Sequence, residues 1–328
     1  MTTTTPAATS VRSGTSAAEI AFHYDVGNDF YALWLDETLS YSAGLWDGVD
    51  GDPADTEALT RAQRAKLDHH LDLAGASGTE GFRLLDVGCG WGGMPAHAVT
   101  TGRVQEATGL TISPAQHAHI TARAQPGVFP LLESWDAHTA ALPYDGIVSV
   151  GAFEHFVTGA MSTEERLAVY GAYFEKCHGW LRPGGRMSLQ TIAYDDQTGP
   201  DGPVGRFVFS SVFPGAALPR LAEITAACDP YFSVTVLTAA PDDYARTLQG
   251  WSARLVRARR EAEELVGADG FRRYRLYLRA SEATFRRRAA TLYRIGFRRR
   301  DEQLRTVRDG GTVRGSWTVR DGGTGHAS

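Results

Sequence analysis

The sequence predicts an α/β fold with a mostly parallel sheet, and two observations carry that prediction. The first is the stretch 82–93, FRLLDVGCGWGG, in which a short apolar run ends in four glycines within six residues. A buried parallel strand that runs into a tight turn and then a helix has this pattern. The second is the alternation of strand-like and helix-like segments over residues 105–192, which is typical of strand–helix–strand units.

The glycines after the first strand predict a ligand site. Glycine has no Cβ, so Gly88 and Gly90 can take positive φ and let a ligand approach the backbone closely. Ligands of open α/β sheets bind at the carboxyl ends of strands, and a bare strand–turn–helix corner is the less favoured alternative. The spacing also fits the dinucleotide fingerprint G-x-G-x-x-G. However, the acid, Asp86, precedes the glycines, and the next strand ends at residues 109–111 without an acid to hold a ribose, which disfavours NAD.

Composition narrows the class of protein. The chain has 328 residues, 43% hydrophobic and 22% charged, which is ordinary for a soluble globular protein of one large or two small domains. No apolar run approaches the roughly 18 residues of a membrane span, and the N-terminus lacks a signal-peptide core. Cys89, Cys177 and Cys228 form an odd number without metal-ligand spacing. We therefore expect reduced thiols, no metal and a cytoplasmic location.

Charge is distributed unevenly along the chain. Residues 251–308 hold 17 arginines and no lysine against seven acidic residues, whereas the rest holds 16 basic against 31 acidic residues. This asymmetry indicates an anionic partner for the C-terminal third, namely a phosphate, an acyl carrier protein or a membrane surface. Solvated helix faces are an equally good interpretation. The basic run carries no nucleic-acid-binding motif, which disfavours nucleic acid.

The other expected elements follow from periodicity and turn residues. We expect disorder at 1–17, an aromatic-rich helical segment at 18–73 that covers a ligand or packs on the sheet, a sheet core at 74–245, a helical region at 246–300, a last strand at 301–308 and a disordered tail at 309–328. Expected strands are 105–110, 128–132, 146–150, 186–192, 231–237 and 303–307, with a helix at 163–180, one starting at Pro114, and a loop at 195–205. Two helical stripes, core or the wall of an acyl tunnel, comprise Trp251, Leu255, Ala258, Ala262 and Leu265, and then Tyr274, Leu278, Ser281, Phe285, Ala289 and Leu292.

Six separated motifs occur in the order HYDVGNDFYALWLDETLSYSAGLW, LLDVGCGWGG, GLTISPAQ, SVGAFEHF, FPGAALPRL and DDYARTLQGW. From His23 to Phe297 the chain resembles the cyclopropane-fatty-acid synthase and mycolic-acid methyltransferase family, which are class I methyltransferases dependent on S-adenosylmethionine (SAM). The resemblance implies a Rossmann-like fold with a mostly parallel seven-stranded sheet. It also implies a helical lid from the N-terminal segment and the C-terminal helix pair.

The resemblance implies SAM as the cofactor, and it assigns binding residues by their motifs. They are Tyr41 and Ser42 from the lid, Asp86, Gly88 and Gly90 at the end of the first strand, Thr111, Ile112 and Gln116 on the ribose side, and Trp135 beside the adenine. Glutamine stands here where a strand-end acid is usual.

The catalytic pattern of the family is only partly present. In the cyclopropane synthases a bicarbonate acts as base, held by a cysteine, a glutamate, a histidine, an isoleucine carbonyl and a tyrosine. Glu154, Ile192 and Tyr244 match this set, but alanine (Ala43) replaces the cysteine and glutamine (Gln190) replaces the histidine. We therefore expect that bicarbonate does not bind in the usual way and that Glu154 acts directly as base. A structural hydrogen-bonding role is the alternative for Glu154.

The resemblance together with these departures predicts methyl transfer to an unsaturated or electron-rich carbon of a hydrophobic small molecule or acyl chain. Cyclopropane formation on an acyl alkene, N-methylation of an amine, and a cofactor-binding protein without catalysis stay as alternatives. Only 22 residues precede His23, whereas the phospholipid-modifying members carry an additional lipid-binding domain there, so we expect a carrier-bound or free substrate. Substrate identity and oligomeric state are outside what the sequence specifies.

Overall fold

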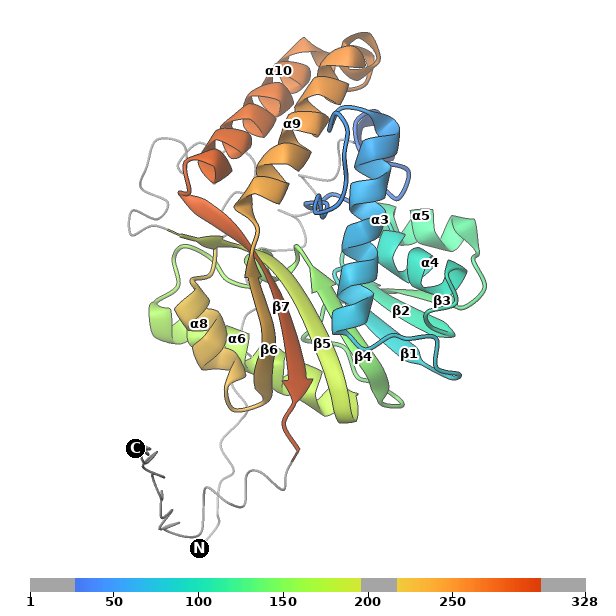
Figure 1. Cartoon of the computed structure of the whole chain (residues 1–328), viewed down its shortest axis with the longest axis vertical. Coiled ribbons are helices and arrows are strands. Elements are labelled where there is room, and N and C mark those ends of the chain that lie inside the picture. Colours follow the sequence, from blue (N-terminus) through green and yellow to red (C-terminus); the bar gives the residue numbers. More distant parts are fainter. Residues whose placement is uncertain (1–26, 196–216, 302–328) are drawn as a thin grey trace, which may run out of the picture.

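A single seven-stranded sheet forms the centre of the protein. The computed structural model describes residues 27–195 and 217–301, and the strand order is β3-β2-β1-β4-β5-β7-β6 (Figure 1). Strands β1 to β5 pair in parallel, and β7 runs antiparallel to both of its neighbours. The strands are β1 (Arg83–Val87), β2 (Glu106–Thr111), β3 (Val128–Leu132), β4 (Tyr144–Val150), β5 (Leu181–Tyr194), β6 (Phe232–Ala239) and β7 (Ala290–Arg299). The predicted α/β class and mostly parallel sheet are confirmed.

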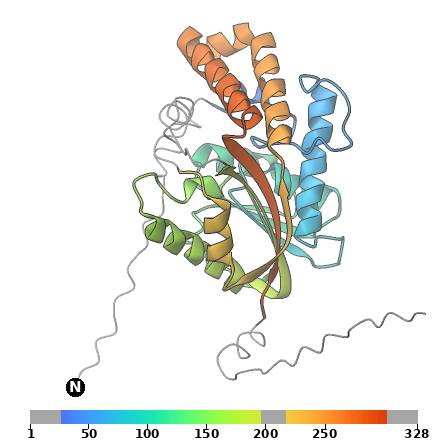
Figure 2. The same cartoon turned by 60° about the vertical axis from the view of Figure 1, so that its left-hand side comes forward.

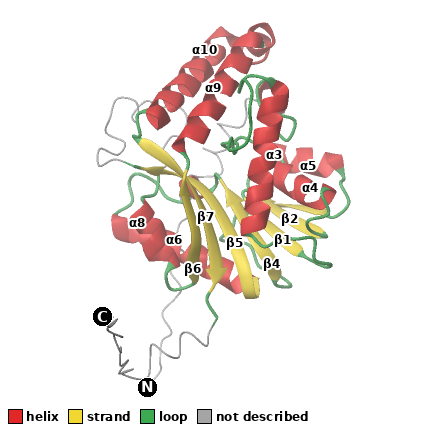
Figure 3. Cartoon of the chain, viewed as in Figure 1, coloured by secondary structure: helices red, strands yellow, loops and turns green. Residues whose placement is uncertain are grey.

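Helices cover both faces of the sheet and one end of it (Figure 3). Helices α3, α4 and α5 lie on one face, α6 and α8 on the other, and α9 and α10 stand above the sheet at the carboxyl ends of the parallel strands. The helical elements are α2 (Asn28–Ala32), α3 (Thr56–Leu73), α4 (Gly93–Thr100), α5 (Pro114–Arg123), the short 3₁₀ helix η1 (Phe153–His155), α6 (Thr163–Trp180), α8 (Leu221–Cys228), α9 (Pro241–Arg257) and α10 (Arg259–Arg286).

The continuous apolar run of β1 has a direct structural cause. Successive side chains of a strand point to opposite faces, and both faces of this sheet are covered. Leu84 packs in the cluster beneath α3 and α4, whereas Leu85 packs in the cluster beneath α6. A strand buried on both sides cannot alternate polar and apolar residues, so β1 has no polar alternation.

Local signals fixed several helix starts. Ser113 caps α5 by accepting a hydrogen bond from the Gln116 backbone, and Pro114 is its first residue, as predicted. Ser162 and Glu165 form a capping box at the start of α6, which stabilises a helix N-terminus by satisfying two backbone donors.

A third buried cluster joins the N-terminal segment to the C-terminal helix pair. Aromatic residues of α2 and of the loop that follows it, among them Tyr31, Trp34 and Tyr41, pack against Trp251 of α9 and Tyr274 of α10. Figure 2 shows α9 and α10 as an antiparallel hairpin beside the upper half of α3. The lid therefore combines segments that lie some 200 residues apart in the chain.

Two expectations about the C-terminal third were wrong. The second stripe predicted helix through Leu292, but α10 ends at Arg286, Arg288 takes positive φ (58°), and Leu292 lies in β7. A β-branched and aromatic run, TLYRIGF, fills the sheet position between β5 and β6 and overrides the helical spacing. The first stripe is not continuous core either, because Ala258 separates α9 from α10 and Leu265 is 48% exposed.

Some predictions lie beyond the described residues. The segments 1–17, 303–307 and 309–328 and most of the 195–205 loop are among them. The boundaries between lid and core stay a prediction. None of the helices within residues 27–195 and 217–301 is long and apolar enough to cross a membrane.

Candidate active site

The glycine turn after β1 is held between the short helix η1 and the lid. Gly88 has φ of +81°, and a Cβ there would come within 2.4 Å of the Cβ of Ala152, just before η1. A Cβ on Gly93 would come within 2.6 Å of the Thr38 carbonyl oxygen in the lid. The backbone N–H of Gly88 donates to the Leu110 carbonyl at the end of β2. Only residues without a side chain allow three segments to meet this closely.

The same turn offers a cradle for a ligand. Gly90 has φ of +54°, and no atom lies within 4 Å of the position of a Cβ there. Asp86, next to the end of β1, is 2% exposed, and burial raises the pKa of its carboxyl to about 7, although Lys66 opposes that shift. Open space over a glycine backbone beside a buried carboxyl fits the approach of the methionine part of SAM.

The end of β2 forms a locked polar corner. Thr111 donates through Oγ1 to Oε1 of Gln116 (2.8 Å), and the Ser113 backbone N–H donates to the Thr111 hydroxyl (3.2 Å). All three are buried, with Ile112 half-buried between them. The predicted ribose-side residues therefore do lie together, and the corner holds an amide where a carboxylate is usual.

Trp135 lies among aromatic rings. It is 7% exposed and packs 5.2 Å from the ring of Phe156 and 5.4 Å from that of Tyr173. Phe156 follows η1 directly, so the indole shares a cluster with the segment that carries Glu154.

The lid loop is tied to two helices. Tyr41 donates its hydroxyl to Tyr277 of α10 (3.2 Å), and Gln63 of α3 donates to the Ser42 carbonyl (2.8 Å). Lys66, also on α3 and 2% exposed, donates to the Ser42 hydroxyl (3.1 Å), and burial lowers the pKa of its ammonium to about 8. Ser42 is thus held by two buried donors of α3, and Tyr41 is held by a buried acceptor on α10.

Glu154 is the carboxyl group of the site that is best suited to exchange a proton. It is 5% exposed, its Oε1 accepts the backbone N–H of Ile192 on β5 (2.7 Å), and its Oε2 is buried with no hydrogen-bond partner within the described residues. Desolvation raises the pKa of this carboxyl to about 7, although the bond from Ile192 lowers it. A group with a pKa near neutrality can exchange a proton in either direction.

Gln190 has its amide fully engaged inside the protein. Oε1 accepts a hydrogen bond from Nε of Arg294 (2.9 Å) and lies 3.2 Å from Nε2 of His70, while Nε2 donates to the Ala43 carbonyl (3.5 Å). His70 also bonds Ser188 through Nδ1 (2.7 Å), and burial lowers the pKa of its imidazole well below the ordinary value. The imidazole of His70, on α3, is therefore neutral, and it contacts the amide oxygen of Gln190 on β5.

Arg294 joins three parts of the site. This guanidinium is 1% exposed and donates to Gln190 on β5, to the carboxylate of Asp243 at the start of α9 (2.7 Å), and to the Gly44 carbonyl of the lid (2.9 Å). Asp243 precedes Tyr244, whose ring lies 4.5 Å from that of Phe285 and 6.2 Å from that of Trp251. The three nitrogens of this one guanidinium thus connect the sheet, α9 and the lid.

Most of the chain matches a known family. The family model described as mycolic acid cyclopropane synthetase matches residues 12–295. The chain belongs to this family. One relative of this chain, cyclopropane mycolic acid synthase 2 of Mycobacterium leprae, is 32% identical over 289 residues, which cover 81% of this chain and 88% of the relative. Cyclopropane mycolic acid synthase 1 of Mycobacterium tuberculosis is 33% identical over 296 residues, covering 85% and 93%.

Solved structures agree with these relatives. A crystal structure of the mycolic acid cyclopropane synthase CmaA1, complexed with S-adenosylhomocysteine (SAH) and CTAB, superposes on this chain with a TM-score of 0.75. The two chains are 30% identical, and the match covers 87% of this chain and 99% of the other. The protein is thus a SAM-dependent methyltransferase with a class I fold, as the motifs predicted.

The sequence missed the buried polar residues behind the site. Gln63, Lys66 and His70 recur at spacings of three and four along α3, so they share one helix face, and that face is buried. The spacing was a usable signal. Arg294 gave none, because it stands among arginines in a segment that was predicted to be helical.

Proposed function

We propose that the protein transfers a methyl group from SAM to an unsaturated or electron-rich carbon of a hydrophobic small molecule or acyl chain. The observation that carries this proposal is the Glu154 carboxylate, which is fixed through Oε1 by Ile192 and whose buried Oε2 has no hydrogen-bond partner among residues 27–195 and 217–301. A buried acceptor without a partner is costly, so a ligand that donates a hydrogen bond or a proton to Oε2 is favoured there.

The cofactor site in this proposal follows the motif residues. When bound, SAM supplies a methyl carbon made electrophilic by its sulfonium. Gly88 and Gly90 would admit its methionine part, and the other contacts would come from Tyr41, Ser42, Asp86, Thr111, Ile112, Gln116 and Trp135. Two features support this placement, namely the open space over Gly90 and the locked corner at the end of β2.

The residues of the chain have three tasks in the reaction. They hold the acceptor in line with the methyl carbon, which can be worth about 7–11 kcal/mol of barrier. The acceptor's π pair forms the new C–C bond while the C–S bond breaks, and the ring of Tyr244 can stabilise the resulting cation. Oε2 of Glu154 then takes a proton from a carbon next to the cation, and the electron pair of the broken C–H bond restores the double bond.

The surroundings of Gln190 argue against bicarbonate as the base. Both polar ends of its amide are already bonded to Arg294, His70 and the Ala43 carbonyl. The Ala43 side chain offers no donor in place of a thiol. An anion there would lack two of the family's contacts, which supports Glu154 as the direct base.

Cyclopropane formation is the second candidate. The names of the two cyclopropane mycolic acid synthases described above support it, as do the retained Glu154 and Tyr244. In that reaction the base takes the proton from the transferred methyl group, and the ring closes. The two candidates thus share one site and differ in which proton leaves.

Substrate class and location complete the proposal. The related enzyme with SAH also bound CTAB, which supports a hydrophobic acceptor, free or carrier-bound. The arginine-rich helices support an anionic partner. All three cysteines are buried and free, which supports a reducing, cytoplasmic location.

Isotope counting tests the proposal. The protein is incubated with methyl-deuterated SAM and a lipid-plus-metabolite extract, and labelled products are analysed by mass spectrometry. A product that keeps three deuteriums is expected for methyl transfer to carbon, whereas a product with two deuteriums means that a methyl proton was lost and that a cyclopropane or a methylene group was formed.

A further inference from the structure

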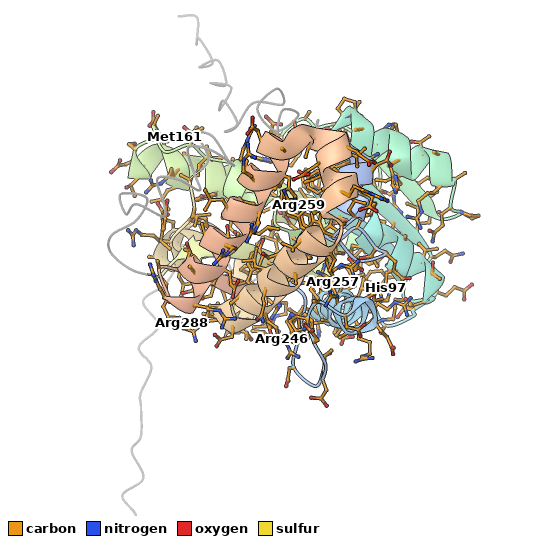
Figure 4. All side chains as sticks on the ribbon, turned by 90° about the horizontal axis from the view of Figure 1, so that it is seen from above. His97, Met161, Arg246, Arg257, Arg259 and Arg288 are labelled. Atoms are coloured by element: carbon orange, nitrogen blue, oxygen red, sulfur yellow. The ribbon has the colours of Figure 1, made fainter. Side chains whose placement is uncertain are left out.

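The arginines of the C-terminal hairpin fall into two groups that behave differently. On α9, Arg254 donates to the Trp34 and Leu35 carbonyls, Arg257 to the Ala54 carbonyl (2.8 Å) and Arg246 to the Gly51 carbonyl (2.8 Å). In Figure 4, Arg246 and Arg257 lie on the side of the hairpin near the N-terminal lid segment. These arginines hold the lid together and need no external partner.

The arginines of α10 face outward instead. Arg272, Arg275, Arg279 and Arg286 are exposed and recur at spacings of three, four and seven residues, which places them on one side of a helix. Leu276, 54% exposed, lies within this stripe. The opposite side carries the buried Tyr274, Tyr277, Leu278 and Phe285 of the lid cluster. One helix thus walls the aromatic lid with its inner face and presents cations with its outer face.

Of the exposed arginines on this side and at the end of α10, two are paired with carboxylates and three are not, within the described residues. Arg272 pairs with Asp269 and Arg286 with Glu282. Arg275, Arg279 and Arg287, at the end of the helix, have no carboxylate within 4.0 Å in the described parts of the chain. Unneutralised guanidinium groups beside an exposed leucine are a costly surface to display without a use, because each adds to the positive self-repulsion.

We propose that the outer face of α10, centred on Arg275, Leu276 and Arg279 with Arg287 at its end, docks on an anionic lipid surface. Guanidinium groups bind phosphate oxygens in a bidentate manner, and a leucine between them can enter the acyl boundary. In Figure 4, which looks down on the molecule from above, the hairpin of α9 and α10 lies in front of the rest of the chain. A flat phosphate-bearing plane fits a linear stripe with a central apolar residue.

The proposal rests on the proposed function in one respect, the hydrophobic acceptor. Such an acceptor dissolves in membranes, and docking through α10 would bring the lid cluster to the surface where the acceptor is found. An acidic carrier protein is the competing source of negative charge, and the experiment below distinguishes it from a lipid surface.

Vesicle co-sedimentation of the full-length protein tests the proposal without turnover. Vesicles of phosphatidylglycerol with phosphatidylcholine are compared with pure phosphatidylcholine, at low and at high salt. The test variant is Arg275→Gln/Arg279→Gln/Arg287→Gln. The matched control is Arg123→Gln/Arg186→Gln/Arg298→Gln, which removes three exposed arginines on α5, β5 and β7 that also lack a carboxylate within 4.0 Å.

We expect binding to the anionic vesicles only, and its loss at high salt. At about 1 kcal/mol for each arginine near an anionic surface, the test variant should lower the partition coefficient on the order of a hundredfold. The control should retain most of the binding, and Leu276→Ser should lower it roughly tenfold through lost apolar burial.

Equal binding of test and control variants would overturn the proposal, as would absence of vesicle binding. Binding of an acidic carrier protein that depends on the three test arginines, without vesicle binding, would also overturn it. Methyl transfer is measured separately on a detergent-dispersed acceptor, so a failure of docking and a failure of the proposed reaction give different results.

Discussion

The two halves of the candidate site are built by different means. The cofactor half consists of backbone: glycines at close approaches, a turn bonded to β2 and a capped helix. The acceptor half consists of buried side chains, with Gln190, His70 and Arg294 bonded to one another. A backbone site depends on a few glycines and tolerates little change. A side-chain site can be rebuilt by exchanging residues, and here two of the family's residues are exchanged.

The largest expected effect separates the halves by chemistry. Glu154→Gln keeps the shape of the side chain but removes the base. We expect kcat to fall by about 10²–10⁴-fold, while SAM affinity measured by calorimetry stays within a few-fold of the original. Retained activity would show that a group other than Glu154 accepts the proton that the methylated acceptor loses.

The next prediction concerns the acceptor half alone. Arg294→Met removes the guanidinium that donates to the Asp243 carboxylate, the Gln190 amide oxygen and the Gly44 carbonyl. Removing one partner of a buried ion pair costs about 3–5 kcal/mol, so the urea-unfolding free energy should drop by that amount.

Arg288→Met is the matched control for this substitution. Arg288 pairs with Asp242 on the surface at 2.8 Å, with side chains 48% and 80% exposed. Because solvent screens such pairs, we expect a loss below about 1 kcal/mol. Similar losses in both variants would mean that the buried network does not hold the acceptor half.

The cofactor half is tested by Gly88→Ala. The new Cβ would meet the Cβ of Ala152 at 2.4 Å and would keep a positive φ, so about 2–4 kcal/mol of stability should be lost together with SAM binding. Gly81→Ala has a similar φ of +75° with nothing within 4 Å. It should cost only the backbone strain, about 1 kcal/mol, and leave SAM binding intact. Retained SAM binding in the Gly88 variant would contradict the close approach.

The smallest effect is a pH dependence of stability. Burial lowers the pKa of His70 in the folded protein, so the unfolded chain binds a proton that the folded chain refuses. Stability should therefore fall as pH drops below about 6.5, by up to about 1.4 kcal/mol per pH unit from this group. His70→Gln should make that slope shallower in chemical unfolding measured from pH 7 to 5. An unchanged slope would assign the effect to other histidines.

Sequence patterns predicted the strand, the glycine turn and the capped helix well because their determinants are local. A strand, four glycines and a capped helix are adjacent in the chain, and Pro114 and Ser113 lay where the pattern placed them. The seventh strand was missed, because the run after Arg286 has helical spacing and its strand pairing depends on β5 and β6. The Gln190 substitution was visible, but its consequence was not. His70 and Arg294 lie 120 and 104 residues away in the chain, and only the fold brings them together.

The most direct test of the account is the pH dependence of kcat in buffer free of bicarbonate, with the acceptor identified by isotope labelling. Burial raises the pKa of Glu154 to about 7. Below that pH the carboxyl is protonated and cannot accept a proton, so the rate should rise through about pH 7. Added bicarbonate should leave the profile unchanged. A rate that requires bicarbonate, or a profile that persists in Glu154→Gln, would contradict the direct role of this carboxylate.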